Sequence, residues 1–197
     1  MGGCLGEVWG DVWGFFRGGW GEVLERFLGE TRLLETNECS GCDLRKANLS
    51  NANLIGADLE GANLQGANLS GANLAVSILS DANLSNANLS RATINDADLR
   101  GANLTDAYLS HANLSRAYLT EANLENANMH QANLKNTDFS NANLTQAKLM
   151  ETNITLANLN GANLEGVNLR GTTIGLSVCL ITNYIGCAPQ KVIPEVE

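Results

Sequence analysis

The sequence predicts an all-β solenoid, a fold built by stacking many copies of one short unit. From residue 42 to residue 174 a five-residue unit repeats without an insertion or a deletion. An apolar residue stands at the centre of all 27 units, from Leu44 to Ile174, and because 22 of them are Leu this position is expected to face a core. Self-similarity at a fixed period is the sequence signature of a repeat architecture.

The unit itself excludes the common regular elements. The residue two positions before the central one is Ala in 21 of 27 units, and the residue directly before the central one is Asn or Asp in 21 of 27. Apolar positions therefore follow one another at spacings of two and three residues in turn. This pattern fits neither the helical period nor strict strand alternation. Asn disfavours a helix, whereas it suits turns and tolerates left-handed geometry. The chain is therefore predicted to turn once per unit, with Ala and Leu inward and the other three positions facing water.

The tandem units also carry a family resemblance. Residues 47–74 read ANLSN ANLIG ADLEG ANLQG ANLSG ANL. This A-[ND]-L-x-x pattern resembles the pentapeptide-repeat proteins, and cyanobacterial members in particular, over about two thirds of the chain. The resemblance implies a right-handed quadrilateral β-helix with four units in each coil. On that geometry residues twenty apart stack, the units make nearly seven coils, and strand spacing of ~4.8 Å gives a rod roughly 32 Å long.

The flanking segments divide the rest of the chain. Residues 1–21 form an amphipathic extension rich in Trp and Gly, and residues 22–41 an N-terminal cap whose stretch from Glu22 to Thr36 resembles the short cap of this family. The repeats occupy 42–174, and residues 175–197 form a C-terminal cap and tail. The apolar run from Leu176 to Ile185 is expected to cover the last coil, because an open solenoid end invites edge-to-edge growth.

Helical spacing of apolar residues predicts that the extension is a helix that can dock on another surface. Its candidate docking residues are Trp9, Trp13, Phe16 and Trp20. Three interpretations compete: packing along the rod or against a second copy in a homo-oligomer, binding a protein partner, or lying on a membrane surface. A glycine stripe at four-residue spacing favours close helix approach, whereas acidic side chains oppose binding to anionic lipid.

One face of the rod is a candidate interaction surface. If four units make a coil, the units centred on Leu89, Leu109, Met129 and Leu149 stack on one face. Large or charged side chains on an otherwise small polar surface resemble the composition of interaction patches. The competing interpretation is drift on a tolerant solvated face. The residues are Arg91, Tyr108, His111, His130, Gln131, Lys148, Met150 and Glu151.

Cysteine positions bear on the cellular compartment. Cys39 and Cys42 precede the coils and Cys179 and Cys187 follow them, so the rod between the pairs excludes a shared four-cysteine zinc site. Two interpretations stay open: the cysteines are simply small residues near the caps, or they form local disulfides within each pair in an oxidising compartment. The N-terminus lacks the pattern of a signal peptide, so a cytoplasmic location is expected, with an exported or lumenal one left open.

The sequence points to a non-enzymatic scaffold for protein–protein interaction, acting through a rod face and the N-terminal helix. No catalytic motif, cofactor site or metal site is recognised, and the net charge of −9 opposes nucleic-acid binding. The protein partner is not identified by the sequence. The alternative is a DNA mimic acting on gyrase or another topoisomerase, as some members of the family do. It ranks second because eight basic residues interleave with twelve acidic ones over residues 43–174.

Overall fold

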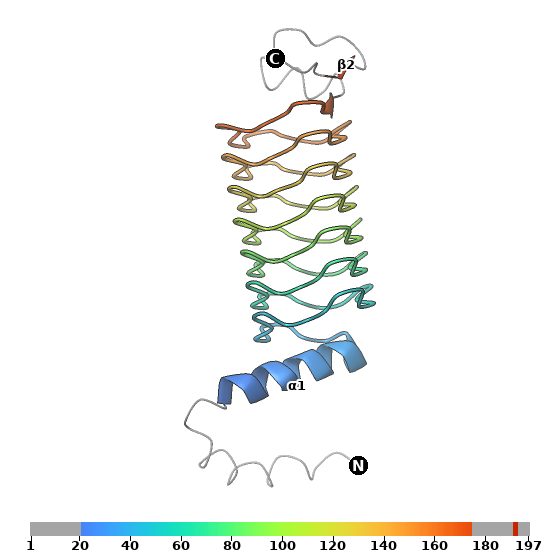
Figure 1. Ribbon diagram of the computed structural model, residues 1–197, viewed down its shortest axis with the longest axis vertical. Coiled ribbons are helices and arrows are strands. Elements are labelled where there is room, and N and C mark those ends of the chain that lie inside the picture. The colour runs from blue at the N-terminus through green and yellow to red at the C-terminus, as the bar shows by residue number, and fades with distance from the viewer. Residues whose placement is uncertain (1–20, 175–190, 193–197) are drawn as a thin grey trace.

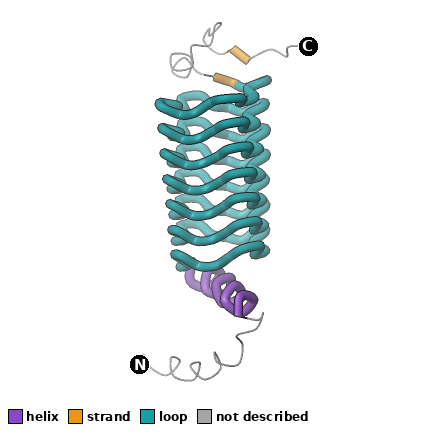
Figure 2. The backbone as a smooth tube through the Cα atoms, turned by 90° about the vertical axis from the view of Figure 1, so that its left-hand side faces the viewer, coloured by secondary structure: helices purple, strands orange, loops and turns teal. Residues whose placement is uncertain are grey.

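The computed structural model describes residues 21–174 and 191–192. Helix α1 spans Gly21–Thr36 and is followed by a regular stack of coils that ends in strand β1, Thr173–Ile174. Figures 1 and 2 show the coils as successive levels of one rod, with α1 lying across its N-terminal end. Strand β2, Lys191–Val192, pairs antiparallel with β1.

Parallel backbone bridges between residues twenty apart hold the coils together. They run without a gap in the series from Glu38 with Asp58 to Asn153 with Thr173. In the middle of the rod the Leu64 amide donates to the Asn83 carbonyl at 2.7 Å, and the Asn83 amide donates to the Ala62 carbonyl at 2.9 Å. One coil therefore contains four units, and residues twenty apart stack as the family resemblance implies.

Each unit turns through a residue of left-handed conformation. In the unit around Leu84, the Ala87 amide donates to the Leu84 carbonyl at 3.0 Å and Asn86 has a φ of 58°. A four-residue turn with a positive φ at its third residue is the pattern of a type II turn. The same position, two residues after the central apolar one, has a positive φ from Lys46 to Gly171. The Asn of the A-N-L triplet is therefore not the left-handed residue that its tolerance of that geometry suggested.

The triplet Asn and Asp side chains instead bond to the backbone and to each other. The Asn68 side-chain oxygen accepts a hydrogen bond from the amide of Ser70 at 3.2 Å, and this pattern recurs along the rod. Between coils, the Asn143 side-chain amide donates to the Asn123 oxygen at 3.0 Å. The ladder thus serves its own backbone, as expected of a side chain that mimics a turn.

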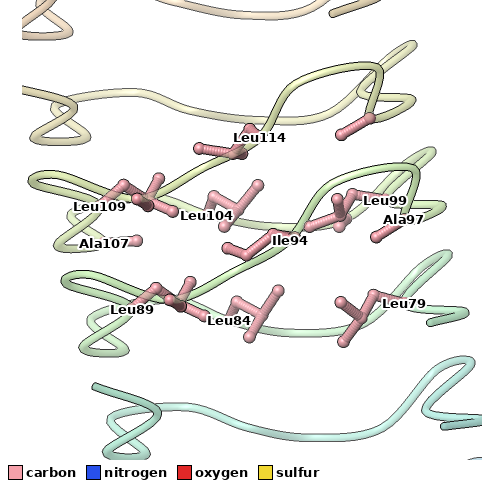
Figure 3. Packing of buried hydrophobic residues seen from close by; sticks show 14 of the residues in the cluster. Leu79, Leu84, Leu89, Ile94, Ala97, Leu99, Leu104, Ala107, Leu109 and Leu114 are labelled. Carbon is pink, nitrogen blue, oxygen red and sulfur yellow. The ribbon is translucent and has the colours of Figure 1, made fainter. Parts of the chain in front are cut away.

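The core is a column of Leu and Ala from all four sides of the rod. Figure 3 shows Leu84, Leu89, Leu104 and Leu109 directed into the interior enclosed by the coils, and all four are fully buried. This confirms the inward direction predicted for the central position. Where a polar residue replaces the inward Ala, its hydroxyl bonds to a backbone carbonyl, as Thr137 does to Leu114 at 2.8 Å. The substitution is tolerated because the buried hydroxyl is satisfied.

The two ends of the rod are closed differently. At the N-terminal end, α1 packs against the first coil, and its Leu33 is fully buried. At the last coil Thr173 bridges Asn153 on one side and Val192 of β2 on the other, which pairs part of the open edge. Residues 1–20 of the extension helix predicted for residues 1–21, and the predicted cover from Leu176 to Ile185, lie outside the described residues. Within the described part of the chain, no helix combines the length and apolar character needed to cross a bilayer.

The inward column predicts a large difference between two identical truncations. Leu104 is fully buried, whereas Leu156 is 58% exposed. Leu104→Ala should cost about 2 to 5 kcal/mol in the free energy of unfolding, because it removes buried methyl groups and leaves a cavity. Leu156→Ala should stay within about 0.5 kcal/mol. Denaturant melts followed by circular dichroism measure both, and equal losses would contradict the inward assignment.

The left-handed corners predict a reciprocal pair of effects. Val76, a β-branched residue, has a φ of 59°, whereas Gly56, one coil earlier at the same position, has a φ of 66°. Left-handed geometry costs a residue with a side chain roughly 1 to 2 kcal/mol, and β-branched residues adopt it least readily. Val76→Asn should therefore raise the melting temperature. Gly56→Val should lower it for backbone reasons alone, since an added Cβ meets no atom within 4 Å.

Candidate functional site

The coil register sorts the charges of the rod onto different faces. The bridge ladder places Glu38, Asp58, Asp98 and Asp138 in one column, interrupted by two exposed side chains, Ile78 and Tyr118. The units of this face carry seven carboxylates against the single guanidinium of Arg100, a formal charge of −6. We call it the acidic face, with the carboxylates of Glu38, Asp58, Glu60, Asp81, Asp98, Glu121 and Asp138.

Backbone bonds fix the positions of several of these carboxylates. Oδ1 of Asp58 accepts a hydrogen bond from the amide of Glu60 at 3.1 Å, and Oδ1 of Asp138 accepts one from the amide of Ser140 at 3.0 Å. The Arg100 guanidinium, which donates hydrogen bonds to Asp98, lowers the pKa of that carboxyl below its ordinary value. The acidic face thus contains a row of carboxylates in which Asp58, Asp98 and Asp138 are two coils apart.

The face two units away along the coil, on the opposite side of the rod, has the opposite balance. Its units, centred from Leu49 to Leu169, carry Arg91, Lys148 and Arg170 against the single carboxylate of Glu151. We call it the histidine face. The eight predicted interaction residues all belong to its units, so stacking brings together Arg91, Tyr108, His111, His130, Gln131, Lys148, Met150 and Glu151.

Contacts between neighbouring coils organise the middle of the histidine face. The rings of His111 and His130 lie edge to face with centroids 6.1 Å apart. The Gln131 side chain donates to Glu151 at 2.6 Å, and Tyr108 is 54% exposed. Nδ1 of His130 is buried and has no hydrogen-bond partner among the described residues. An exposed aromatic ring and two imidazoles in units of the same face provide both apolar and polar contact groups.

An ion pair joins two coils on a third face. Arg116 contacts Asp96 at 2.6 Å through its Nε, and the hydrogen bonds from Arg116, followed by one from Asn95, lower the pKa of Asp96 to about 2. Asp96 and Arg116 both occupy the left-handed position of their units. The ion pair therefore links the turns of two successive coils.

The remaining predicted site residues divide between the cap and the undescribed segments. Cys39 and Cys42 are joined in a disulfide at the first coil, with Cα atoms 5.2 Å apart. Trp9, Trp13, Phe16, Trp20, Cys179 and Cys187 lie outside the described residues. Among the described residues, no group of three or more His, Cys, Asp or Glu side chains is arranged to hold a metal ion.

Comparison with known proteins decides the family. The sequence profile of pentapeptide repeats matches residues 38–75, 67–106, 102–141 and 137–174. The chain belongs to the pentapeptide-repeat family. Pentapeptide-repeat proteins form right-handed quadrilateral β-helices, which agrees with the fold expected from the sequence. No curated protein matches the chain.

Three solved pentapeptide-repeat structures illustrate the likeness. HetL, involved in heterocyst differentiation regulation in the cyanobacterium Nostoc sp. strain PCC 7120, is 32% identical over 70% of this chain and 76% of its own, with a TM-score of 0.43. A protein of the Arabidopsis thaliana thylakoid lumen is 28% identical over 46% of this chain and 63% of its own, with a TM-score of 0.45. QnrB1, a plasmid-mediated fluoroquinolone resistance protein, is 18% identical over 75% of this chain and 86% of its own, with a TM-score of 0.31.

The acidic face was missed by sequence reasoning, although its signal was present. Counting charges along residues 43–174 mixes the four sides of the rod, and the rod then looks only mildly acidic. Counting them in steps of twenty separates the faces. The same stacking step that located the histidine face would have found the acidic one.

The lowered pKa of Asp96 predicts a pH-dependent loss in one variant. A carboxyl whose pKa is depressed in the folded state contributes stability above its ordinary pKa of 3.8, and that contribution is lost as the pH falls through the folded-state pKa of about 2. Asp96→Asn should lower the melting temperature slightly at neutral pH, and the difference from the wild type should shrink between about pH 4 and pH 2. The effect is small because solvent screens an exposed pair.

Asp106→Asn is the matched control, since Asp106 holds the same left-handed position two units later. Thermal melts across this pH range compare the two variants. A pH-independent difference for Asp96→Asn would contradict the ion-pair assignment.

Proposed function

We propose that this protein is a non-enzymatic scaffold, a rod of nearly seven coils capped by α1, whose faces bind protein partners of different charge. One observation carries the proposal: the acidic face has a formal charge of −6, while the opposite histidine face carries three basic residues against one acidic residue. Pentapeptide-repeat proteins are generally structural or interaction proteins rather than enzymes, which supports this class of function.

The charge separation supports oriented binding. Exposed charges act over roughly 8 Å at physiological ionic strength, so a partner meeting one side of the rod is influenced mainly by that side. A row of carboxylates accelerates encounter with a basic surface and repels acidic ones. Exposed Ile78 and Tyr118 interrupt the acidic column and supply apolar contact area. We therefore infer that the acidic face binds a Lys- and Arg-rich protein surface, and that the histidine face remains available to a second partner.

Replacing Asp by Asn at three positions of the acidic column tests this inference. Asn is the commonest residue at this position of the unit, and its oxygen can keep the backbone hydrogen bond that Asp58, Asp98 and Asp138 each accept. The triple variant should bind a fluorescent oligolysine peptide about tenfold more weakly in anisotropy titrations at low salt, because three charge contacts are lost at up to roughly 0.5 kcal/mol each.

The matched control neutralises the opposite side through Arg91→Gln with Lys148→Gln, and it should leave oligolysine affinity unchanged or slightly raised. Used as affinity baits, the two variants should lose different sets of captured proteins. If the control raised oligolysine affinity by a factor comparable to the loss in the triple variant, the charge would act as a net property of the rod and the face-specific proposal would be wrong.

A DNA mimic acting on gyrase is the second candidate, and the acidic face is the observation that favours it. A duplex, however, presents phosphates on all sides, whereas the opposite side of this rod is net basic. We expect the purified protein to leave the supercoiling activity of a bacterial gyrase unchanged. Potent inhibition that disappears in the triple Asp→Asn variant would favour mimicry over the scaffold.

A further inference from the structure

Helix α1 turns Gly29 and Leu33 toward the rod and three large apolar residues away from it. On the inner side Gly29 is buried, and a Cβ added there would lie 3.3 Å from the Asp43 carbonyl oxygen and 3.4 Å from a methyl group of Leu44. Leu33, one turn further, is fully buried. The helix thus approaches the first coil closely at Gly29, where no side chain separates it from the coil.

The outer side of α1 carries three large apolar side chains in solvent. Phe27, Leu28 and Leu34 are 63%, 52% and 56% exposed. At 100° per residue their positions span an arc of about 120°, which is the width of a stripe that normally packs against another element. α1 lies across the end of the rod, so no coil can reach this side (Figure 1). The outer stripe of α1, meaning these three residues, therefore lacks a covering element among the described residues.

We propose that residues 1–20 of the same chain cover the outer stripe of α1 as an antiparallel helix. Residue 20 precedes the first residue of α1 directly, so the segment cannot be far from the stripe. Its sequence has apolar residues at helical spacing, Leu5, Val8, Trp9, Val12, Trp13 and Phe16, followed by the pair Gly18 and Gly19 that suits a tight connection between two helices. Seventeen helical residues would span about 25 Å, close to the 24 Å or so of a sixteen-residue helix such as α1.

The covalent connection favours this occupant over a second copy of the chain. A segment joined by a short linker has an effective concentration in the millimolar range, whereas a second copy competes only at its own concentration. The proposal does not rest on the rod-face function, and it makes the tryptophans part of the cap rather than a free docking surface.

The positions of the tryptophans make a direct test available in the full-length protein. All three, Trp9, Trp13 and Trp20, belong to residues 1–20, so intrinsic tryptophan fluorescence reports on this segment alone. Phe27→Asp and the milder Leu34→Asn place polar groups on the outer stripe. Each should shift the tryptophan emission to longer wavelength and raise acrylamide quenching by about twofold, because a polar stripe no longer buries apolar rings.

Leu156→Asp is the matched control, since Leu156 is equally exposed at 58% but lies on the side of the rod. It should leave emission and quenching unchanged, and the circular dichroism of the rod should be retained in all three variants. Unchanged quenching in the stripe variants would overturn the proposal. So would loss of the rod signal, which would place these side chains in the core.

A dilution series distinguishes residues 1–20 from a second copy of the chain as the segment that covers the outer stripe. If a second copy covered the stripe, quenching of the wild type would rise on dilution and sedimentation would show a dimer that Phe27→Asp dissociates, which would also overturn the proposal. Concentration-independent quenching of a monomer, combined with the response to both stripe variants, is the expected result.

Discussion

The twenty-residue register of the backbone hydrogen bonds is the constraint on which the whole structure depends. Each coil satisfies its amides and carbonyls on the coils before and after it, at 2.6 to 3.0 Å in most pairs. A single coil could not do this, because its backbone groups would face open edges. One inserted residue would break the twenty-residue spacing of every pair that spans it, so the uninterrupted run from residue 42 to residue 174 keeps all the pairs in register.

The corner geometry explains the composition of the unit. The left-handed residue follows the central apolar one by two positions, and Gly, Asn, Asp or a long polar residue stands there in most units. Gly and Asn adopt this conformation at low cost, whereas Val76 and Leu156 do so against their preference. The Asn of the triplet has a different role, since its side-chain oxygen accepts a hydrogen bond from the backbone amide two residues later, as Asn83 does from Ser85. Two positions of the unit therefore favour Asn for separate physical reasons.

The same register turns a one-dimensional sequence into four chemically distinct faces. Residues spaced by twenty become neighbours at the distance of stacked strands, so Asp58, Asp98 and Asp138 form one row although forty residues separate each from the next. The sides of the rod are rigid, because their backbone is fixed in the ladder. Charged side chains on such a surface keep their arrangement without paying the ordering entropy that a loop would lose on binding. This makes the rod faces suited to recognition.

The amino-acid sequence by itself determined the unit, its inward residues and the once-per-unit turn, because Leu and Ala at a fixed spacing are a local signal. The number of units in a coil came from the family resemblance, since nothing within one unit specifies which later unit it stacks on. Only the tertiary structure decided the rest. The backbone bridges fix the pairing of residues twenty apart, on which the acidic face depends, and the left-handed position is set by the turn rather than by the most frequent Asn. The outer stripe of α1 was equally undetermined, because the helix has apolar residues on two sides and the close fit of Gly29 against the first coil selects which side is buried.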